Sequence, residues 1–161
     1  MHPRASSLIA TLNLAPHPEG GFFREIFRSS AIVTPSPTGS QRRAITSIYY
    51  LLSDGQVSKF HRVGSDEVWH FLEGDSLELH RIDPSLVTLQ THLLGPASDK
   101  AQPVHVVPAN FWQAAVPTGA FTLVGCTAGP GFEYEDFTLL AENANMVQTV
   151  GRRFPRMATL L

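Results

Sequence analysis

Short apolar runs, each ended by turn residues, follow one another from about residue 44 to residue 138. Several runs alternate apolar and polar side chains, which is the pattern of a strand with one buried face. Glycine, proline, asparagine, aspartate and serine separate them, and these residues favour turns. Strands without intervening helices indicate an all-β sandwich or barrel. The predicted strands are 45–52, 57–63, 67–72, 77–82, 86–93, 104–107, 111–116 and 121–127.

Both ends of the chain carry weaker patterns. Leu8, Ile9 and Leu12 form an apolar stripe after Ser6 and Ser7, so we expect a short N-terminal helix capped by one of these serines. An aromatic strand is expected at 20–29, a loop rich in proline at 34–41, and a second short helix around 139–148. No role is assigned to the last twenty residues.

Composition narrows the class of protein. The chain has 161 residues, 43% hydrophobic and 16% charged, as in one globular domain, here 1–161. A formal charge of −2 and the lack of a basic stripe argue against nucleic-acid binding. We find no signal-peptide pattern and no apolar run long enough for a membrane span, so we expect a cytoplasmic protein. The single cysteine, Cys126, lies in an apolar run and is expected in the core.

The strands at 57–63 and 67–72 carry the candidate chemistry. Alternate side chains of a strand share a face, so Lys59 and His61 are expected to point the same way, and Glu67 shares a face with Trp69 on the next strand. If these faces line the interior, an ammonium, an imidazole and a carboxylate converge there. Buried charges need partners, which an internal ion pair, a ligand or a metal could supply.

The spacing of Gly55, His61, Glu67 and Gly74 resembles the first sequence motif of the cupins, small β-barrels that hold a metal or a polar ligand. Val63 stands where a metal-binding cupin has its second histidine.

The second cupin motif is represented by the segment from Pro108 to Pro117. Asn110 replaces its glycine, Gln113 replaces its histidine and Pro117 its asparagine. Transition metals prefer three or four imidazole, carboxylate or thiolate ligands. No metal or other cofactor is therefore favoured, although a divalent metal, if bound, would use His61, Glu67 and Gln113.

The resemblance extends over residues 12 to 140, through the segments 17–25, 48–52, 59–71, 74–80 and 129–137. On these segments the chain is identified as a member of a cupin-like family of unknown function, near the dTDP-sugar epimerases in shape. The resemblance implies a double-stranded β-helix, or jelly roll, usually a homodimer, with a polar pocket in the barrel. It implies no particular reaction. It also places Glu25, Glu133 and Tyr134 beside the pocket.

Further residues are candidates for binding a ligand. Trp69 and Trp112 would serve as pocket-wall or core aromatics, Gln113 as a polar contact, and His70 as a substitute ligand in a shifted register. The remaining histidines are expected to be hydrogen-bonded residues of the core or surface. They are His17, His80, His92 and His105.

Three function hypotheses follow. The leading one is a metal-independent isomerase or epimerase acting on a small polar, sugar-like metabolite, with His61 as base, Lys59 stabilising an enolate and Glu67 orienting the imidazole. The alternatives are a non-catalytic cupin that binds a small ligand and a metal-dependent dioxygenase or decarboxylase. The expected partners are a small molecule and a second copy of the chain, with no nucleic acid and no membrane.

Overall fold

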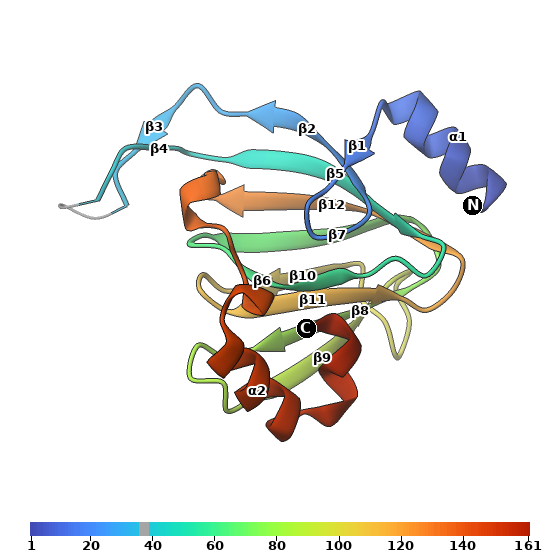
Figure 1. The fold of residues 1–161 in the computed structure, drawn as a ribbon. Coiled ribbons are helices and arrows are strands. Elements are labelled where there is room, and N and C mark those ends of the chain that lie inside the picture. Colours follow the sequence, from blue (N-terminus) through green and yellow to red (C-terminus); the bar gives the residue numbers. More distant parts are fainter. Residues whose placement is uncertain (36–38) are drawn as a thin grey trace.

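Two antiparallel sheets face each other in the computed structural model, which describes residues 1–35 and 39–161 (Figure 1). The six-stranded sheet has the order β1 (Ala15–Pro16), β2 (Phe22–Arg28), β5 (Thr46–Ser53), β12 (Phe121–Gly129), β7 (Asp66–Gly74), β10 (Val104–Val107). The five-stranded sheet has the order β13 (Thr138–Leu139), β6 (Ser58–Arg62), β11 (Trp112–Pro117), β8 (Leu77–Ile82), β9 (Leu89–Leu94). The predicted all-β jelly roll is confirmed.

Helices and short strands complete the chain. The helices are α1 (Pro3–Leu12) and α2 (Ala144–Arg153), and the 3-10 segments are η1 (Tyr134–Asp136), η2 (Leu140–Glu142) and η3 (Pro155–Leu160). A separate pair joins β3 (Ile32–Val33) and β4 (Arg42–Arg43). Of the loop predicted at 34–41, residues 36–38 lie outside the described part of the chain. Among the described helices, none is both long enough and apolar enough to cross a membrane.

Both predicted helices start elsewhere than expected. The cap of α1 is His2, whose Nδ1 accepts the backbone N–H of Arg4 at 3.3 Å, so Ser6 and Ser7 lie inside the helix. Pro3 takes the first helical position, where its fixed φ and missing N–H are tolerated. The second helix begins at Ala144, because the side chain of Asn143 accepts the backbone N–H of Met146 at 3.1 Å.

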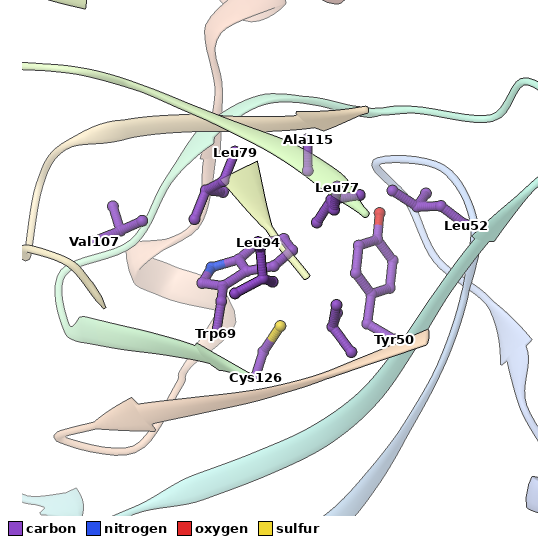
Figure 2. Packing of buried hydrophobic residues seen from close by; sticks show 10 residues of the cluster. Tyr50, Leu52, Trp69, Leu77, Leu79, Leu94, Val107, Ala115 and Cys126 are labelled. Atoms are coloured by element: carbon purple, nitrogen blue, oxygen red, sulfur yellow. The ribbon is translucent and has the colours of Figure 1, made fainter. Parts of the chain in front are cut away.

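The main core fills the space between the sheets. Trp69 lies at its centre, beside the ring of Tyr50 and the thiol of Cys126 (Figure 2). Leu79 and Leu94 close it from the five-stranded sheet, and both are fully buried. This core occupies one part of the interior and leaves the polar residues of β6 and β7 to line another.

The last residues of the chain form a layer on the outside of the five-stranded sheet, where α2 lies in Figure 1. Val150, Met157 and Leu160 pack there against Phe60 and Trp112. The C-terminal segment is therefore a structural cover for the outer face of this sheet. Trp112 is in this layer, so of the two positions expected for it, core and pocket wall, it takes the core. The expectation that it binds a ligand is therefore wrong.

A bulge in β6 reverses the expected direction of Lys59. Gln113 on β11 pairs with His61, and Ala115 pairs with Ser58, so β6 carries one more residue than its partner over this interval. Ser58 and His61 therefore both face inward and are buried, whereas Lys59 is exposed. The Lys59 ammonium donates to the backbone oxygen of Leu161 at 3.1 Å. The prediction that Lys59 converges with His61 inside the barrel is wrong.

Candidate functional site

A cavity opens between β2, β5, β6, β7 and β12 and contains about 640 Å³ of space, part of it open to solvent at the mouth. His61, Glu67 and Glu25 line it, and Val63 occupies the wall at the position where a metal-binding cupin has its second histidine. The lining residues are His17, Glu19, Phe23, Glu25, Arg28, Thr46, Ile48, His61, Val63, Glu67, Cys126, Ala128, Phe132 and Tyr134.

Glu19 enters the cavity from the turn between β1 and β2. Gly20 and Gly21 follow it with φ of 111° and 76°, a region that favours glycine. A Cβ at Gly21 would lie 2.5 Å from the backbone oxygen of Leu51. The phenol of Tyr50 donates to the backbone oxygen of Gly20 at 2.7 Å and fixes the turn from inside. The two glycines thus let the chain approach the barrel closely enough to bury Glu19, which is 7% exposed.

The ring of His61 is held by its Nδ1. This nitrogen lies 2.9 Å from the backbone oxygen of Lys59 and 2.6 Å from Oε2 of Glu19. Because a carbonyl oxygen only accepts, Nδ1 carries a proton. The ring of Phe137 stacks on His61 with centroids 5.5 Å apart. Nε2 is consequently the nitrogen available to a ligand in the cavity.

The protonation of His61 is governed by its neighbours. Burial alone would lower the pKa of His61, but the charge and hydrogen bond of Glu19, with a further contribution from Glu67, raise it to about 9. For Glu19 the balance is similar: burial opposes ionisation, yet His61, His17 and Ser58 lower the pKa of Glu19 below its ordinary value. Glu19 and His61 form a buried ion pair at neutral pH.

His17 stands on the other side of Glu19. The backbone N–H of Glu19 donates to Nδ1 of His17 at 3.2 Å, so that nitrogen carries a lone pair. Burial lowers the pKa of His17, more than the nearby Glu19 raises it. The neutral imidazole packs edge-on against Phe23 with centroids 4.6 Å apart. His17 therefore supports the turn and lines the cavity wall as an uncharged group.

Glu67 is positioned by two hydrogen bonds that run through Gln113, here called the relay, and the chemistry of the donors fixes their directions. The indole N–H of Trp69 donates to Oε1 of Gln113 at 3.0 Å, and an indole nitrogen can only donate. The amide nitrogen of Gln113 must then face Glu67, and it donates to Oε2 at 2.5 Å. Burial raises the pKa of Glu67 above its ordinary value, although His61 and Gln113 act in the opposite direction. Gln113 thus fixes one oxygen of the Glu67 carboxyl group and leaves the other free in the cavity.

The donor set does not fit a transition metal. Gln113 presents its N–H₂ to Glu67, and its oxygen is occupied by Trp69, so it cannot serve as an oxygen ligand without breaking the relay. Val63 supplies no donor. Within residues 1–35 and 39–161, no three His, Cys, Asp or Glu side chains come together as metal ligands would. Only His61 and Glu67 remain of the three predicted ligands, which is too few for a typical site.

The mouth of the cavity carries an ion-pair cluster. Arg28 donates to Glu25 at 2.8 and 3.1 Å, and to Glu133 at 3.1 Å. Phe132 and Tyr134 flank it, with ring centroids 5.1 Å apart. Glu25, Arg28 and Tyr134 line the cavity, and Glu133 lies beside it through its contact with Arg28.

The other predicted ligand-binding residues lie elsewhere. Trp69 is in the main core and reaches the site only through Gln113. His70 is the neighbour of Trp69 on β7, so its side chain lies on the opposite face of the sheet. Its register partners on the adjacent strands are Val104 and Gly125. The expectation that His70 substitutes for a missing ligand is wrong, because β7 keeps the register that turns Glu67 and Trp69 toward the interior.

Sequence reasoning missed Glu19 and His17 as site residues. Their segment, 17–25, was recognised as a specific part of the resemblance, but the strand pattern gave no reason to bring it to the barrel interior. The paired glycines were the available signal, because they mark a close backbone approach.

A family model described as "Cupin superfamily (DUF985)" matches residues 6–140. The chain belongs to this cupin family. No significant match among curated proteins is found for it.

Solved structures agree with this membership. A Shewanella oneidensis protein is 34% identical to this cupin, with a TM-score of 0.79, over 97% of this chain and 93% of the other. A hypothetical protein from Leishmania major is 29% identical, with a TM-score of 0.80, over 97% and 95%. Oxalate decarboxylase from Bacillus subtilis is 14% identical, with a TM-score of 0.58, over 91% of this cupin and 36% of the enzyme, a likeness of fold alone.

Proposed function

We propose that this cupin is a metal-independent isomerase or epimerase acting on a small polar, sugar-like carbonyl compound. The observation that carries the proposal is the arrangement of two titratable groups in one cavity: His61, charged and held by Glu19, and Glu67, held by Gln113. A proton taken from carbon beside a carbonyl needs a base, and the developing enolate needs an electrophile.

The geometry supports roles that differ from those expected from the sequence. His61 is protonated at neutral pH, so its Nε2–H is suited to donate to the carbonyl oxygen and stabilise the enolate. Glu67, whose pKa is raised, is suited to take the proton from carbon. Glu19 takes the orienting role that the sequence analysis gave to Glu67, and Lys59 has no part in the cavity.

One base and one electrophile favour a particular class of proton transfer. A 1,2-shift from an aldose to a ketose moves a proton from C2 to C1, and a single carboxylate can carry out both transfers at carbon. The carbonyl oxygen at C1 must also gain a proton and the hydroxyl at C2 must lose one, and the imidazolium of His61 is suited to donate the first and take up the second. An inversion at carbon requires a proton donor on the opposite face as well. Tyr134 is 62% exposed at the mouth and is the candidate for that second donor. The site supports the 1,2-shift best.

The test is solvent exchange at carbon. The protein is incubated with aldoses and ketoses in D₂O, and deuterium incorporation beside the carbonyl is followed by NMR. We expect incorporation with at least one compound, lowered by about 100-fold or more in Glu67→Gln and His61→Gln. Glu142→Gln, an exposed change of the same kind, serves as the control.

The non-catalytic alternative gives a different result in the same samples. If a compound binds without exchange, and binds Glu67→Gln and His61→Gln equally well, the pocket captures a ligand and the isomerase proposal fails. Retained exchange in both variants would assign the chemistry to other groups.

We also propose that the cupin forms a homodimer. The pairing of β1 with β2 covers only Phe22 and Phe23, so the edge of β2 from Arg24 to Arg28 is open along the described chain. Phe27 on this edge is 54% exposed. Open strand edges are sites of strand pairing with other chains. Light scattering on Phe27→Glu and wild type tests this, since a monomeric wild type would contradict the proposal.

A further inference from the structure

The cations at the pocket are all neutralised by carboxylates of the same chain. His61 is paired with Glu19 at 2.6 Å, and Arg28 with Glu25 and Glu133 at 2.8 and 3.1 Å. Among the described lining residues, these two are the charged cations, because His17 is neutral. An anionic group entering the cavity would therefore have to displace a carboxylate to gain a full ion pair.

Neighbouring cations do not change this balance. Arg42 forms an ion pair with Asp136 and donates to the backbone oxygen of Gly131 at 2.6 Å. Arg24 is the register partner of Tyr49 on β5, and Lys59 is outside the barrel. None of these three lines the cavity.

The carboxylates exceed the cations at this end of the barrel. Glu25 and Glu133 share one guanidinium, and Glu67 adds a further acid deeper in the cavity. A phosphate, a pyrophosphate or a carboxylate on the ligand would meet like charges before reaching His61. Such contacts cost free energy when the site is partly desolvated.

The walls fit an uncharged molecule. Phe23, Phe132 and Tyr134 present aromatic faces, and Ile48, Val63 and Ala128 present apolar groups. Polar groups available inside are Nε2 of His61 and the free carboxyl oxygen of Glu67. The hydroxyl of Thr46 already accepts the backbone N–H of Phe132 at 2.8 Å and can still donate. Aromatic walls with a few hydroxyl or carboxyl partners suit a compound that carries hydroxyl groups and no net charge.

We infer that the substrate is an uncharged hydroxycarbonyl compound and that Glu25 and Glu133 set this selectivity by neutralising Arg28. The chemical class of the substrate rests on the proposed function, and its lack of charge rests on the ion pairs at the mouth of the cavity. Glu25 and Glu133 are specificity-determining residues: they keep Arg28 from acting as an anchor for phosphate or carboxylate groups.

The test removes the two carboxylates that neutralise Arg28 and asks whether the cavity then binds anions. Inorganic phosphate and acetate are titrated into wild type and into Glu25→Gln/Glu133→Gln, and binding is followed by amide chemical shifts of Arg28 and Phe132. In wild type we expect no saturable shifts at millimolar concentrations. The double variant frees the guanidinium, so we expect anion affinity at Arg28 to rise by about tenfold or more.

The matched control is Glu135→Gln/Glu142→Gln. It removes the same charge from exposed positions that make no contact with Arg28 among the described interactions, and Glu135 lies in η1, two residues from Glu133. We expect it to behave as wild type. An equal gain in the control would assign the effect to net charge and overturn the role of Glu25 and Glu133.

Two further results would overturn the inference. Saturable binding of phosphate or acetate at the mouth of wild type would show that the site accepts anions. A double variant that keeps the wild-type spectrum elsewhere and gains no anion binding would remove Arg28 as the point of discrimination. Neither result depends on deuterium exchange, so the failure of the proposed function and the failure of the charge selectivity are separable.

Discussion

At the scale of single residues, the charge of His61 is the property on which the site depends. Because the folded pKa is about 9 and the unfolded value is near 6.5, the ion pair with Glu19 stabilises the fold fully below pH 6.5. This contribution is lost as the pH rises through 9. The difference corresponds to about 3 kcal/mol.

We therefore predict that the free energy of unfolding falls between pH 7 and pH 10, and that Glu19→Gln removes most of this fall. Urea titrations across that range measure it. Histidines whose pKa is lowered by burial, such as His80 and His92, titrate below 6.5 and act outside this window. The NMR titration of His61 itself should show a pKa near 9 that drops in Glu19→Gln, and an unchanged pKa would contradict the pairing.

Gln113 is a second residue whose role is open to a direct test. Replacing it with Leu removes partners from the indole N–H of Trp69 and from the carboxyl group of Glu67 at once. We expect a loss of stability of roughly 2–4 kcal/mol, because each unpaired buried group costs about 1–3 kcal/mol. Gln113→Glu is the informative comparison, since it keeps an acceptor for Trp69 and loses the donor to Glu67. If Gln113→Leu leaves the free energy of unfolding unchanged, water has replaced the two hydrogen bonds of the relay.

At the scale of elements, the bulge in β6 decides which side chains reach the cavity. We predict that Lys59→Ala leaves the rate of any exchange reaction within about twofold of wild type, because Lys59 is exposed and binds the C-terminal segment. The regular alternation of a strand would instead predict a large loss. Steady-state kinetics separates the two, and a loss of tenfold or more would place Lys59 at the substrate after all.

The turn at Gly20 and Gly21 gives a further prediction. Gly21→Ala introduces a Cβ at positive φ, close to the backbone of Leu51. We expect the free energy of unfolding to fall by about 2 kcal/mol or more. Because the turn places Glu19, the pKa of His61 should fall as well. Gly55 has a similar φ of 74° and no neighbour near a Cβ. Gly55→Ala therefore measures the cost of a side chain at positive φ without a clash that displaces the backbone.

The same two elements mark the limit of what the sequence predicts. Strands such as β8 and β10 have the predicted bounds, since local alternation and turn residues determine them. The inward position of His61 and Glu67 also follows from alternation. The outward position of Lys59 does not, because a bulge depends on pairing with β11. Glu19 likewise reaches the site through a loop whose path is set by contacts with β5, far along the chain.

At the scale of the whole molecule, residues 1–35 and 39–161 bring no three His, Cys, Asp or Glu side chains together as metal ligands would. We predict substoichiometric zinc, iron, nickel or manganese in protein purified without chelator and without affinity nickel. Elemental analysis of wild type and His61→Ala checks this. Near-stoichiometric metal that disappears in His61→Ala would make metal chemistry the leading hypothesis.

The position of Cys126 has a practical consequence for finding the substrate. It is the one cysteine of the chain, and its side chain is buried in the wall of the cavity. Burial raises the pKa of its thiol well above the ordinary value, so alkylation by a small reagent such as iodoacetamide will be slow at neutral pH and faster in alkaline buffer. A compound that occupies the cavity should slow it further. The rate of mass increase at a single thiol therefore provides a screen that needs no assumption about the reaction.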